Sequence, residues 1–412
     1  MSVPAPTRSR RAPGPALGAA RPRTRQRRRL ASRPFGRPTP EFFLLLATIT
    51  VLLLIGLVMT FSASFVTSTA ETGDAFEIFR RQLLWSAVGA VPLIVAARTD
   101  YRRWRGAAVP LLLLTLLSLV AVAIPSIGIE VNGARRWLGA GAWRFQPTEL
   151  AKLTVPLFLA HVLARRWRVL RSGDLLGLLV PGLPLLVLTG GLIMLEPDFE
   201  TAALIALIGG AVLYAAGLPG RLIALAGAVL AVLATVGVSM SEFRRGRVLA
   251  WLDPFSDPAN FGYQTTQGYL ALGSGGWFGA GLGEGRGKWL FVPNAHTDFI
   301  YAIIGEELGL IGALLVLGLF ASLAVAGTRT ALRAPDPFGR LLAVGITGWM
   351  LLQAGINMGS VVGLLPVTGV TLPLVSFGGT SLVSTMFGLG LLLSIARAGV
   401  DPEPRPSFEE TS

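Results

Sequence analysis

A series of ten long apolar runs, separated by polar turns, constrains the fold more than any other feature of this chain. A helix needs about twenty apolar residues to cross the roughly 30 Å hydrocarbon layer of a bilayer, and most of these runs approach or exceed that length. Because 52% of the 412 residues are hydrophobic and only 14% are charged, one water-soluble core could not bury them. We therefore predict an all-α polytopic membrane protein. The predicted spans are about 42–64, 82–97, 107–124, 149–164, 176–194, 199–216, 220–239, 299–326, 340–363 and 373–397.

The predicted ten-helix membrane domain, residues 41–398, is expected to lie between two cytoplasmic tails. Residues 1–40 are rich in Arg and Pro, hold most of the excess behind the formal charge of +13 and have little apolar surface to bury, so we expect disorder. A basic flank before the first span favours a cytoplasmic N-terminus that touches anionic lipid over a nucleic-acid partner. The run from Phe42 to Phe61 exceeds the apolar part of a signal peptide, so we expect it to be retained. Residues 399–412 should form a short cytoplasmic tail.

Arginine is sorted between the turns as the positive-inside rule requires. With the N-terminus in the cytoplasm, the turns at 98–105, 165–171 and 329–340 lie on the same side and are rich in Arg. The opposite side nevertheless has cations of its own, part of which we read as evidence for an anionic ligand outside the cytoplasm. These cations are Arg80, Arg81, Arg135, Arg136, Arg144, Arg244, Arg245, Arg247, Arg286 and Lys288.

The longest connection, about 240–298, far exceeds a normal turn between helices and is predicted to be a functional extracytoplasmic loop. Its "GAGLGEGRGK" (279–288) is not a phosphate-binding P-loop, because Leu282 stands where that motif needs Gly and Trp289 where it needs Ser or Thr. Cysteine is absent and only His161 and His296 are present, which excludes a Cys/His zinc site but leaves an oxygen-ligated metal open.

Three carboxylates near the start of the eighth predicted span are costly to place in a membrane. Asp298 falls at the outer end of this helix, where it is either an N-cap or a functional acid. At roughly 100° per residue, Glu306 lies about 80° from Asp298 around the helix, whereas Glu307 lies near the opposite face. We therefore expect only Glu306 to share a cavity with Asp298.

Two further groups of charged residues each leave two interpretations open. In "EPDFETA" (196–202), Asp198 either caps the sixth span or faces the same outer cavity as Asp298. Glu149 and Lys152, three residues apart on one helical face, either form an internal ion pair or join Arg136 in a phosphate-binding grip.

Two late segments contain closely spaced glycines. The stripe at 355–363, beside Gln353 and Asn357, favours close helix packing. The "LPLVSFGGTS" segment (372–381) predicts irregular backbone at the head of the last span, which is tolerated only where protein or a wet cavity surrounds it.

Four of these motifs resemble, in order and spacing, those of the SEDS family, the group of FtsW, RodA and SpoVE. They are "NGARRW…QPTELAKL", "EPDFETA", "VPNAHTDFIYAIIGEELG" and "NMGSVVGLLPVTGVTLPLVSFGGTS". The resemblance extends over residues 41–398 and is greatest for the FtsW branch of cell-division peptidoglycan glycosyltransferases. It implies polymerisation of lipid II outside the bacterial cytoplasmic membrane, with release of undecaprenyl diphosphate. A class B penicillin-binding protein transpeptidase and other division proteins are the implied partners.

The resemblance also implies site residues. Asp298 stands at the essential acidic position of the family's "HTDF" motif and is the candidate catalytic base, which would take a proton from the acceptor sugar's 4-hydroxyl. A divalent cation, Mg²⁺ or Mn²⁺, is a candidate cofactor, with Asp298 and Glu306 as its candidate ligands. The candidate substrate-binding residues are Arg136, Glu149, Lys152, Asp198, His296, Glu306 and Ser376.

The sequence departs from the family pattern at a few positions. Glu200 replaces the usual Gly after "PDF" and adds a charge beside Asp198, and Asn294 stands where Glu is common. Other readings remain open: a RodA-like elongation polymerase, a lipid II flippase, which ten spans with intramembrane charge would also suit, or a division scaffold that acts through its tails.

Overall fold

The computed structural model describes residues 38–131, 133–141, 143–167, 173–289, 292–293 and 295–399. The predicted tails lie outside these residues except for 38–40 and 399, and so does Asn294.

Each of the ten predicted spans coincides with a helix. In the part of the chain that the structure describes, eight helices are long and apolar enough to cross a membrane, whereas α3 is shorter and α4 has a Glu–Lys pair in its first two turns. The ten helices are α1 (Pro40–Thr72), α2 (Glu77–Arg98), α3 (Ala108–Ala123), α4 (Pro147–Arg165), α6 (Leu175–Leu195), α7 (Phe199–Ala216), α8 (Gly220–Ser239), α11 (Ile300–Arg333), α12 (Pro337–Val361) and α13 (Gly379–Arg397).

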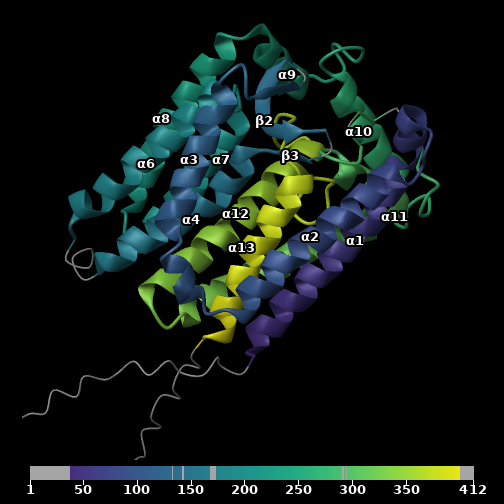
Figure 1. Cartoon of the computed structure of the whole chain (residues 1–412). Coiled ribbons are helices and arrows are strands. Elements are labelled where there is room, and N and C mark those ends of the chain that lie inside the picture. Colours follow the sequence, from purple (N-terminus) through teal and green to yellow (C-terminus); the bar gives the residue numbers. More distant parts are fainter. Residues whose placement is uncertain are drawn as a thin grey trace, which may run out of the picture. The chain divides into compact units, whose positions relative to one another are not determined.

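The centre of the bundle is formed by α12 and α13. In their most apolar windows 67% and 72% of the residues are buried, compared with none in α8. In Figure 1, α1, α2 and α11 pack on one side of this centre and α6, α7 and α8 lie on the other. Because α8 is apolar all round and uncovered by protein, lipid is the solvent that its side chains suit.

The polar connections gather at two opposite ends of the bundle (Figure 1). At one end, the turns at 98–105 and 329–340, which are predicted to be cytoplasmic, meet the start of α1 and the end of α13. The contacts there are Arg333–Glu41 at 2.6 Å, Arg102–Asp336 at 2.9 Å in the turn that contains η1 (Tyr101–Arg105), and Thr39 Oγ1 to the Ala396 carbonyl at 3.0 Å. The long loop lies at the other end. The chain therefore separates the two sets of turns that the charge pattern separates.

Two features of the loops were not predicted. The chain between α3 and α4 forms a small antiparallel sheet in the order β1 (Ile129–Val131), β2 (Ala134–Ala140), β3 (Trp143–Phe145), so the all-α expectation needs this addition. The long loop contains α9 (Glu242–Leu252) and α10 (Tyr263–Ser274). These elements are short, and the signals that dominate the sequence come from the long apolar spans.

Helix α11 is broken at Gly309, where φ is 68° and ψ is −167°. Only glycine adopts this conformation readily, and a Cβ here would lie 2.4 Å from the Gly279 nitrogen. The irregular loop segment 276–281 fills the break. Its backbone hydrogen bonds are Ala280 N–H to Glu306 O at 2.9 Å, Gly281 N–H to Glu307 O at 3.1 Å, Leu310 N–H to Gly276 O at 2.9 Å and Ile311 N–H to Trp277 O at 3.2 Å. The glycine-rich loop is thus part of the helix end rather than a loose connection.

Candidate active site

The carboxylate of Glu306 is bound to the glycine-rich loop, where it accepts the N–H groups of Arg286 at 2.7 Å and Gly287 at 3.1 Å. Helical spacing predicted that Glu306 shares a cavity with Asp298. The structure instead places the Glu306 carboxylate against the glycine-rich loop. That expectation fails because Asp298 precedes the helix, which begins at Ile300, so the angle of 100° per residue does not apply to it.

Glu307 is bound to the same loop and to α1. Its carboxylate accepts hydrogen bonds from the Gly283 N–H at 3.1 Å and the Ser62 hydroxyl at 2.7 Å. It also pairs with Lys288 at 3.2 Å, and both side chains are almost fully buried. These two acids account for the carboxylates within α11: they fasten the loop to the bundle.

Asp298 is in a different situation. The N-cap of α11 is Phe299, so the Asp298 side chain does not cap the helix. Its backbone carbonyl accepts a hydrogen bond from Asn357 Nδ2 at 2.8 Å, and the same amide donates to the Val370 carbonyl at 2.8 Å. In the part of the chain that the structure describes, no hydrogen bond reaches the Asp298 carboxylate, which is half-buried.

Ser376 and His296 hold the segment that contains Asp298. The Ser376 hydroxyl donates to the Thr297 carbonyl at 2.6 Å and accepts from the Leu372 N–H at 2.8 Å. The His296 carbonyl accepts the Phe377 N–H at 3.0 Å, and the two rings pack edge to face. Burial lowers the pKa of His296 to about 4, so its ring is neutral at pH 7. The irregular 372–378 segment is therefore surrounded by protein, as predicted.

Glu200, which sequence reasoning treated only as a departure, faces the same place as Asp298. Its Oε2 accepts the Gly369 N–H at 2.7 Å, and its Oε1 pairs with Arg247 of α9 at 3.3 Å. A Cβ placed on Gly369 would lie 3.5 Å from Glu200 Oε2 and 3.9 Å from Asp298 Oδ2. The two carboxylates thus border one glycine, and the unusual residue at 200 was the available signal.

This environment tunes the acid. Burial raises the pKa of Asp298 to about 7, the negative charge of Glu200 adds to the rise, and Arg247 opposes it. A carboxylate that titrates near neutral pH is suited to take or give a proton under physiological conditions.

Of the two interpretations of Asp198, the structure supports the first: its side chain caps the N-terminus of α7. Its Oδ1 accepts the Thr201 N–H at 3.1 Å and its Oδ2 the Thr201 hydroxyl at 2.9 Å, at the start of α7. Beside it, the Arg136 guanidinium donates to the carbonyls of Glu196 at 3.1 Å and Pro197 at 2.7 Å, which fixes β2 on the α6–α7 turn. Burial raises the pKa of Glu196 to about 8, with a contribution from Asp198.

Glu149 and Lys152 form the internal ion pair, with a distance of 2.7 Å. Lys152 also donates to Gln353 Oε1 at 3.1 Å, and Gln353 Nε2 donates to the Thr371 carbonyl at 2.9 Å. This buried network joins α4 and α12 to the segment beside Asp298. Arg136 and Lys152 therefore bind separate protein partners, and their binding of substrate stays a prediction.

The donor set for a metal is sparse. Within the described ranges no group of three or more His, Cys, Asp and Glu side chains could hold a metal ion. The predicted pair of Asp298 and Glu306 does not fit one, because the Glu306 carboxylate is occupied by backbone N–H groups. Of this pair, only Asp298 has a carboxylate that accepts no hydrogen bond from a described residue.

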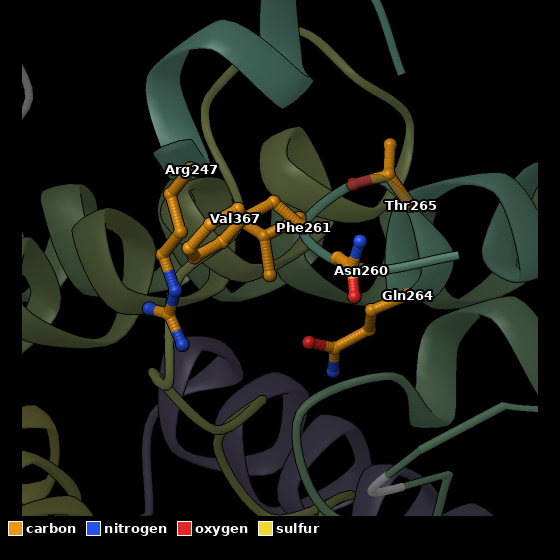
Figure 2. A pocket seen from close by; sticks show the side chains of 6 residues that line it. All are labelled: Arg247, Asn260, Phe261, Gln264, Thr265 and Val367. Carbon is orange, nitrogen blue, oxygen red and sulfur yellow. The ribbon is translucent and has the colours of Figure 1, made fainter. Parts of the chain in front are cut away.

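A pocket of about 160 Å³ lies between the long loop and the chain that follows α12. In Figure 2, Arg247 flanks one side of it and Asn260 and Gln264 the other, with Phe261 and Val367 between them. Sequence reasoning missed this pocket, because α9, α10 and residue 367 meet only in the folded chain.

The fold and the site define a multi-pass membrane protein that has a half-buried carboxylate with a raised pKa and a polar pocket at one end of its helical bundle. Comparison with known proteins identifies its family. A family model described as "Cell cycle protein", that of FtsW, RodA and SpoVE, matches residues 43–399. The chain belongs to this family.

Relatives and solved structures agree. The chain is 44% identical over 380 residues to the probable peptidoglycan glycosyltransferase FtsW of Mycobacterium tuberculosis, covering 92% of this chain and 71% of the relative. It is 39% identical to stage V sporulation protein E of Bacillus subtilis, covering 88% and 98%. A solved structure described as "Structural coordination of polymerization and crosslinking by a peptidoglycan synthase complex" matches with a TM-score of 0.68 and 31% identity. The match covers 87% of this chain and 96% of the other. The rod shape determining protein RodA of Thermus thermophilus matches with TM-score 0.64 and 29% identity, covering 87% and 97%.

Proposed function

We propose that this chain is a peptidoglycan glycosyltransferase of the FtsW type, which polymerises lipid II into septal glycan strands. One observation carries the proposal for the site. The half-buried Asp298 carboxylate has a pKa of about 7, and it accepts no hydrogen bond from a described residue. The names of the relatives, probable peptidoglycan glycosyltransferases, support the reaction class.

Asp298 performs the proton transfer. The 4-hydroxyl of the acceptor sugar is a poor nucleophile, and its proton passes to the Asp298 carboxylate as the oxygen attacks the anomeric carbon of the donor. The new C–O bond forms while the bond to the diphosphate breaks. Undecaprenyl diphosphate leaves with the electron pair, and the anomeric configuration inverts. Asn357 and Ser376 fix the backbone around Asp298, and such positioning contributes much of the rate.

The negative charge that develops on the diphosphate leaving group needs a cationic partner, and the chain supplies such groups only in part. Arg136 and Lys152 are our candidates, although each already binds protein groups. Mg²⁺ or Mn²⁺ often binds through substrate phosphates, so we propose that such an ion would be held mainly by the diphosphate of the substrate. This leaves Glu306 out and leaves the Asp298 carboxylate available to accept the proton.

We also propose the orientation and the partners. The arginine-rich end of the bundle faces the cytoplasm with both termini, and the end with the long loop and Asp298 faces outward. The peptidoglycan synthase complex among the similar structures supports a class B penicillin-binding protein transpeptidase as partner.

Purified full-length chain in vesicles that contain labelled lipid II tests the proposal. We expect glycan polymer from the parent, alone or with the transpeptidase and Mg²⁺, and about 10²- to 10⁴-fold slower polymerisation from Asp298→Asn. Label that crosses the membrane without polymer would identify a flippase instead. Polymer from Asp298→Asn at the parental rate would remove Asp298 from the reaction and keep only the enzyme class.

A further inference from the structure

The pocket lined by Arg247, Asn260, Phe261, Gln264, Thr265 and Val367, which we call the loop pocket, has a preformed wall. The Phe261 ring packs on Gly246 of α9 so closely that a Cβ there would lie 2.6 Å from it. Trp251 Nε1 donates to the Gly363 carbonyl at 2.9 Å, which ties α9 to the chain after α12. These contacts hold α9 against Phe261, just before α10, and against the chain that leads to Val367.

The polar groups of the loop pocket are mainly neutral. Asn260 Nδ2 donates to Asp257 at 2.9 Å, and Gln264 Nε2 lies 3.4 Å from the Pro293 carbonyl. Among the described residues, the amide oxygens of Asn260 and Gln264 accept no hydrogen bond, and Figure 2 shows both amides beside the open space. They are therefore able to accept hydrogen bonds from ligand hydroxyl or amide groups.

The charge of the loop pocket disfavours a phosphate group. Arg247 is its one cationic lining residue, and this residue is paired with Glu200 at 3.3 Å. A diphosphate placed here would meet an acid–base pair instead of a net positive charge. Neutral hydrogen-bonding groups beside an aromatic face suit a sugar ring, whose hydroxyls bind the amides while its C–H groups pack on Phe261.

The size and the place of the loop pocket narrow the ligand. At about 160 Å³ it is smaller than the roughly 300–1,000 Å³ of sites for drug-sized ligands, which limits the ligand to a single small group such as one sugar ring. Glu200 links the loop pocket to the acid: its Oε1 pairs with Arg247 of the lining, while its Oε2 and Asp298 Oδ2 both border Gly369. A ring held here lies beside the group that deprotonates the acceptor.

We propose that the loop pocket binds one N-acetylhexosamine ring of the acceptor strand, with Gln264 and Asn260 as hydrogen-bonding residues and Phe261 as the stacking face. This inference rests on the proposed glycosyltransferase function and adds a specificity site to it. Glu200 holds Arg247 at the border between the ring and Asp298.

The test uses the full chain in nanodiscs and, as probe, the disaccharide-pentapeptide freed of lipid and phosphate, with inorganic diphosphate as a second probe. NMR titration should show that Gln264→Ala weakens binding of the sugar probe by about three- to tenfold, the effect of one lost hydrogen bond. Gly246→Ala should weaken it at least as much, because the added methyl displaces Phe261. Gln267→Ala, the same change on the same helix outside the pocket lining, is the matched control and should bind like the parent.

Polymerisation assays separate this inference from the proposed function. We expect Gln264→Ala to raise KM for lipid II with kcat close to the parent, at an unchanged melting temperature. Parental binding of the sugar probe by Gln264→Ala, an equal loss in Gln267→Ala, or displacement of the sugar by diphosphate would each overturn the loop pocket as a sugar site. If the parent bound the sugar with the expected pattern but made no polymer, the pocket would stand and the polymerase function would fall.

Discussion

Two acidic regions lie at the same end of the bundle, and they differ in what surrounds their carboxylates. In the first, which we call the anchor region, Glu306 and Glu307 accept N–H and hydroxyl donors and pair with Lys288. In the second, the Asp298 carboxylate has a carboxylate neighbour in Glu200 and, among the described residues, no hydrogen-bond donor. Acids that are fully satisfied by protein hold the structure, whereas an acid left without donors is available for substrate.

The largest expected effect distinguishes these regions by rate. Asp298→Asn should lower polymerisation of lipid II by about 10²- to 10⁴-fold, because it removes a general base. The melting temperature should stay at the parental value or rise, because the variant removes a charge that has no hydrogen-bond donor. A loss of activity that is matched by loss of folding would assign Asp298 to structure, as in the anchor region.

The anchor region should respond in the opposite way. Glu307→Gln leaves Lys288 buried without its ion-pair partner, and breaking such a pair costs about 3–5 kcal/mol. We expect a clear fall in the melting temperature measured in detergent, with activity lost only as the loop detaches. Glu284→Gln, which alters an exposed acid of the same loop, is the control and should melt like the parent. Equal stability of the two variants would contradict an anchoring role for Glu307.

The span positions were predictable from sequence because each depends only on local composition. Hydropathy located all ten helices, and the paired spacing of Glu149 and Lys152 suggested an ion pair. The family motif, not the physics of the segment, singled out Asp298. Whether that residue was an N-cap could not be decided, since the boundary of α11 depends on contacts with Asn357 and the 372–378 segment.

The rest depends on contacts between distant segments. Glu200 meets Gly369 across 169 positions, and no periodicity within either segment indicates that pairing. Likewise, Glu306 was placed by helical angle, but its partners are in a loop that fills the break at Gly309. The predicted close packing of the glycine stripe holds for two of its three glycines: a Cβ would lie 3.1 Å from Leu365 at Gly359 and 2.0 Å from the Tyr269 hydroxyl at Gly363, whereas at Gly355 it meets nothing within 4 Å.

An intermediate effect is expected at Asn357, whose fully buried amide joins the Asp298 and Val370 carbonyls. Asn357→Ala leaves both carbonyls without this donor and lets Asp298 shift, and a displacement of about 1 Å costs up to about 10²-fold in rate. We expect a roughly tenfold to hundredfold lower kcat and a lower melting temperature. Gly355→Ala on the same helix should retain activity and stability, because its methyl meets open space. If both variants behaved like the parent, Asn357 would not position the acid.

The smallest effect concerns pH and tests the neighbours of Asp298 directly. The base must be ionised, so kcat/KM should fall as pH drops below about 7, the pKa to which burial and Glu200 raise Asp298. The charged groups around it are Glu200 of α7 and Arg247 of α9, with Asp198 and Arg136 acting on Glu200.

Glu200→Gln removes the negative neighbour, lowers the pKa of Asp298 and should move this acidic limb to lower pH by a fraction of a unit. Arg247→Gln removes the positive neighbour and should move the limb the other way. These opposite shifts separate an electrostatic role from simple damage to the site, since damage would lower the plateau without moving the limb. Limbs that coincide with the parent's in both variants would mean that the Glu200–Arg247 pair does not set the proton affinity of Asp298, and that burial alone raises its pKa.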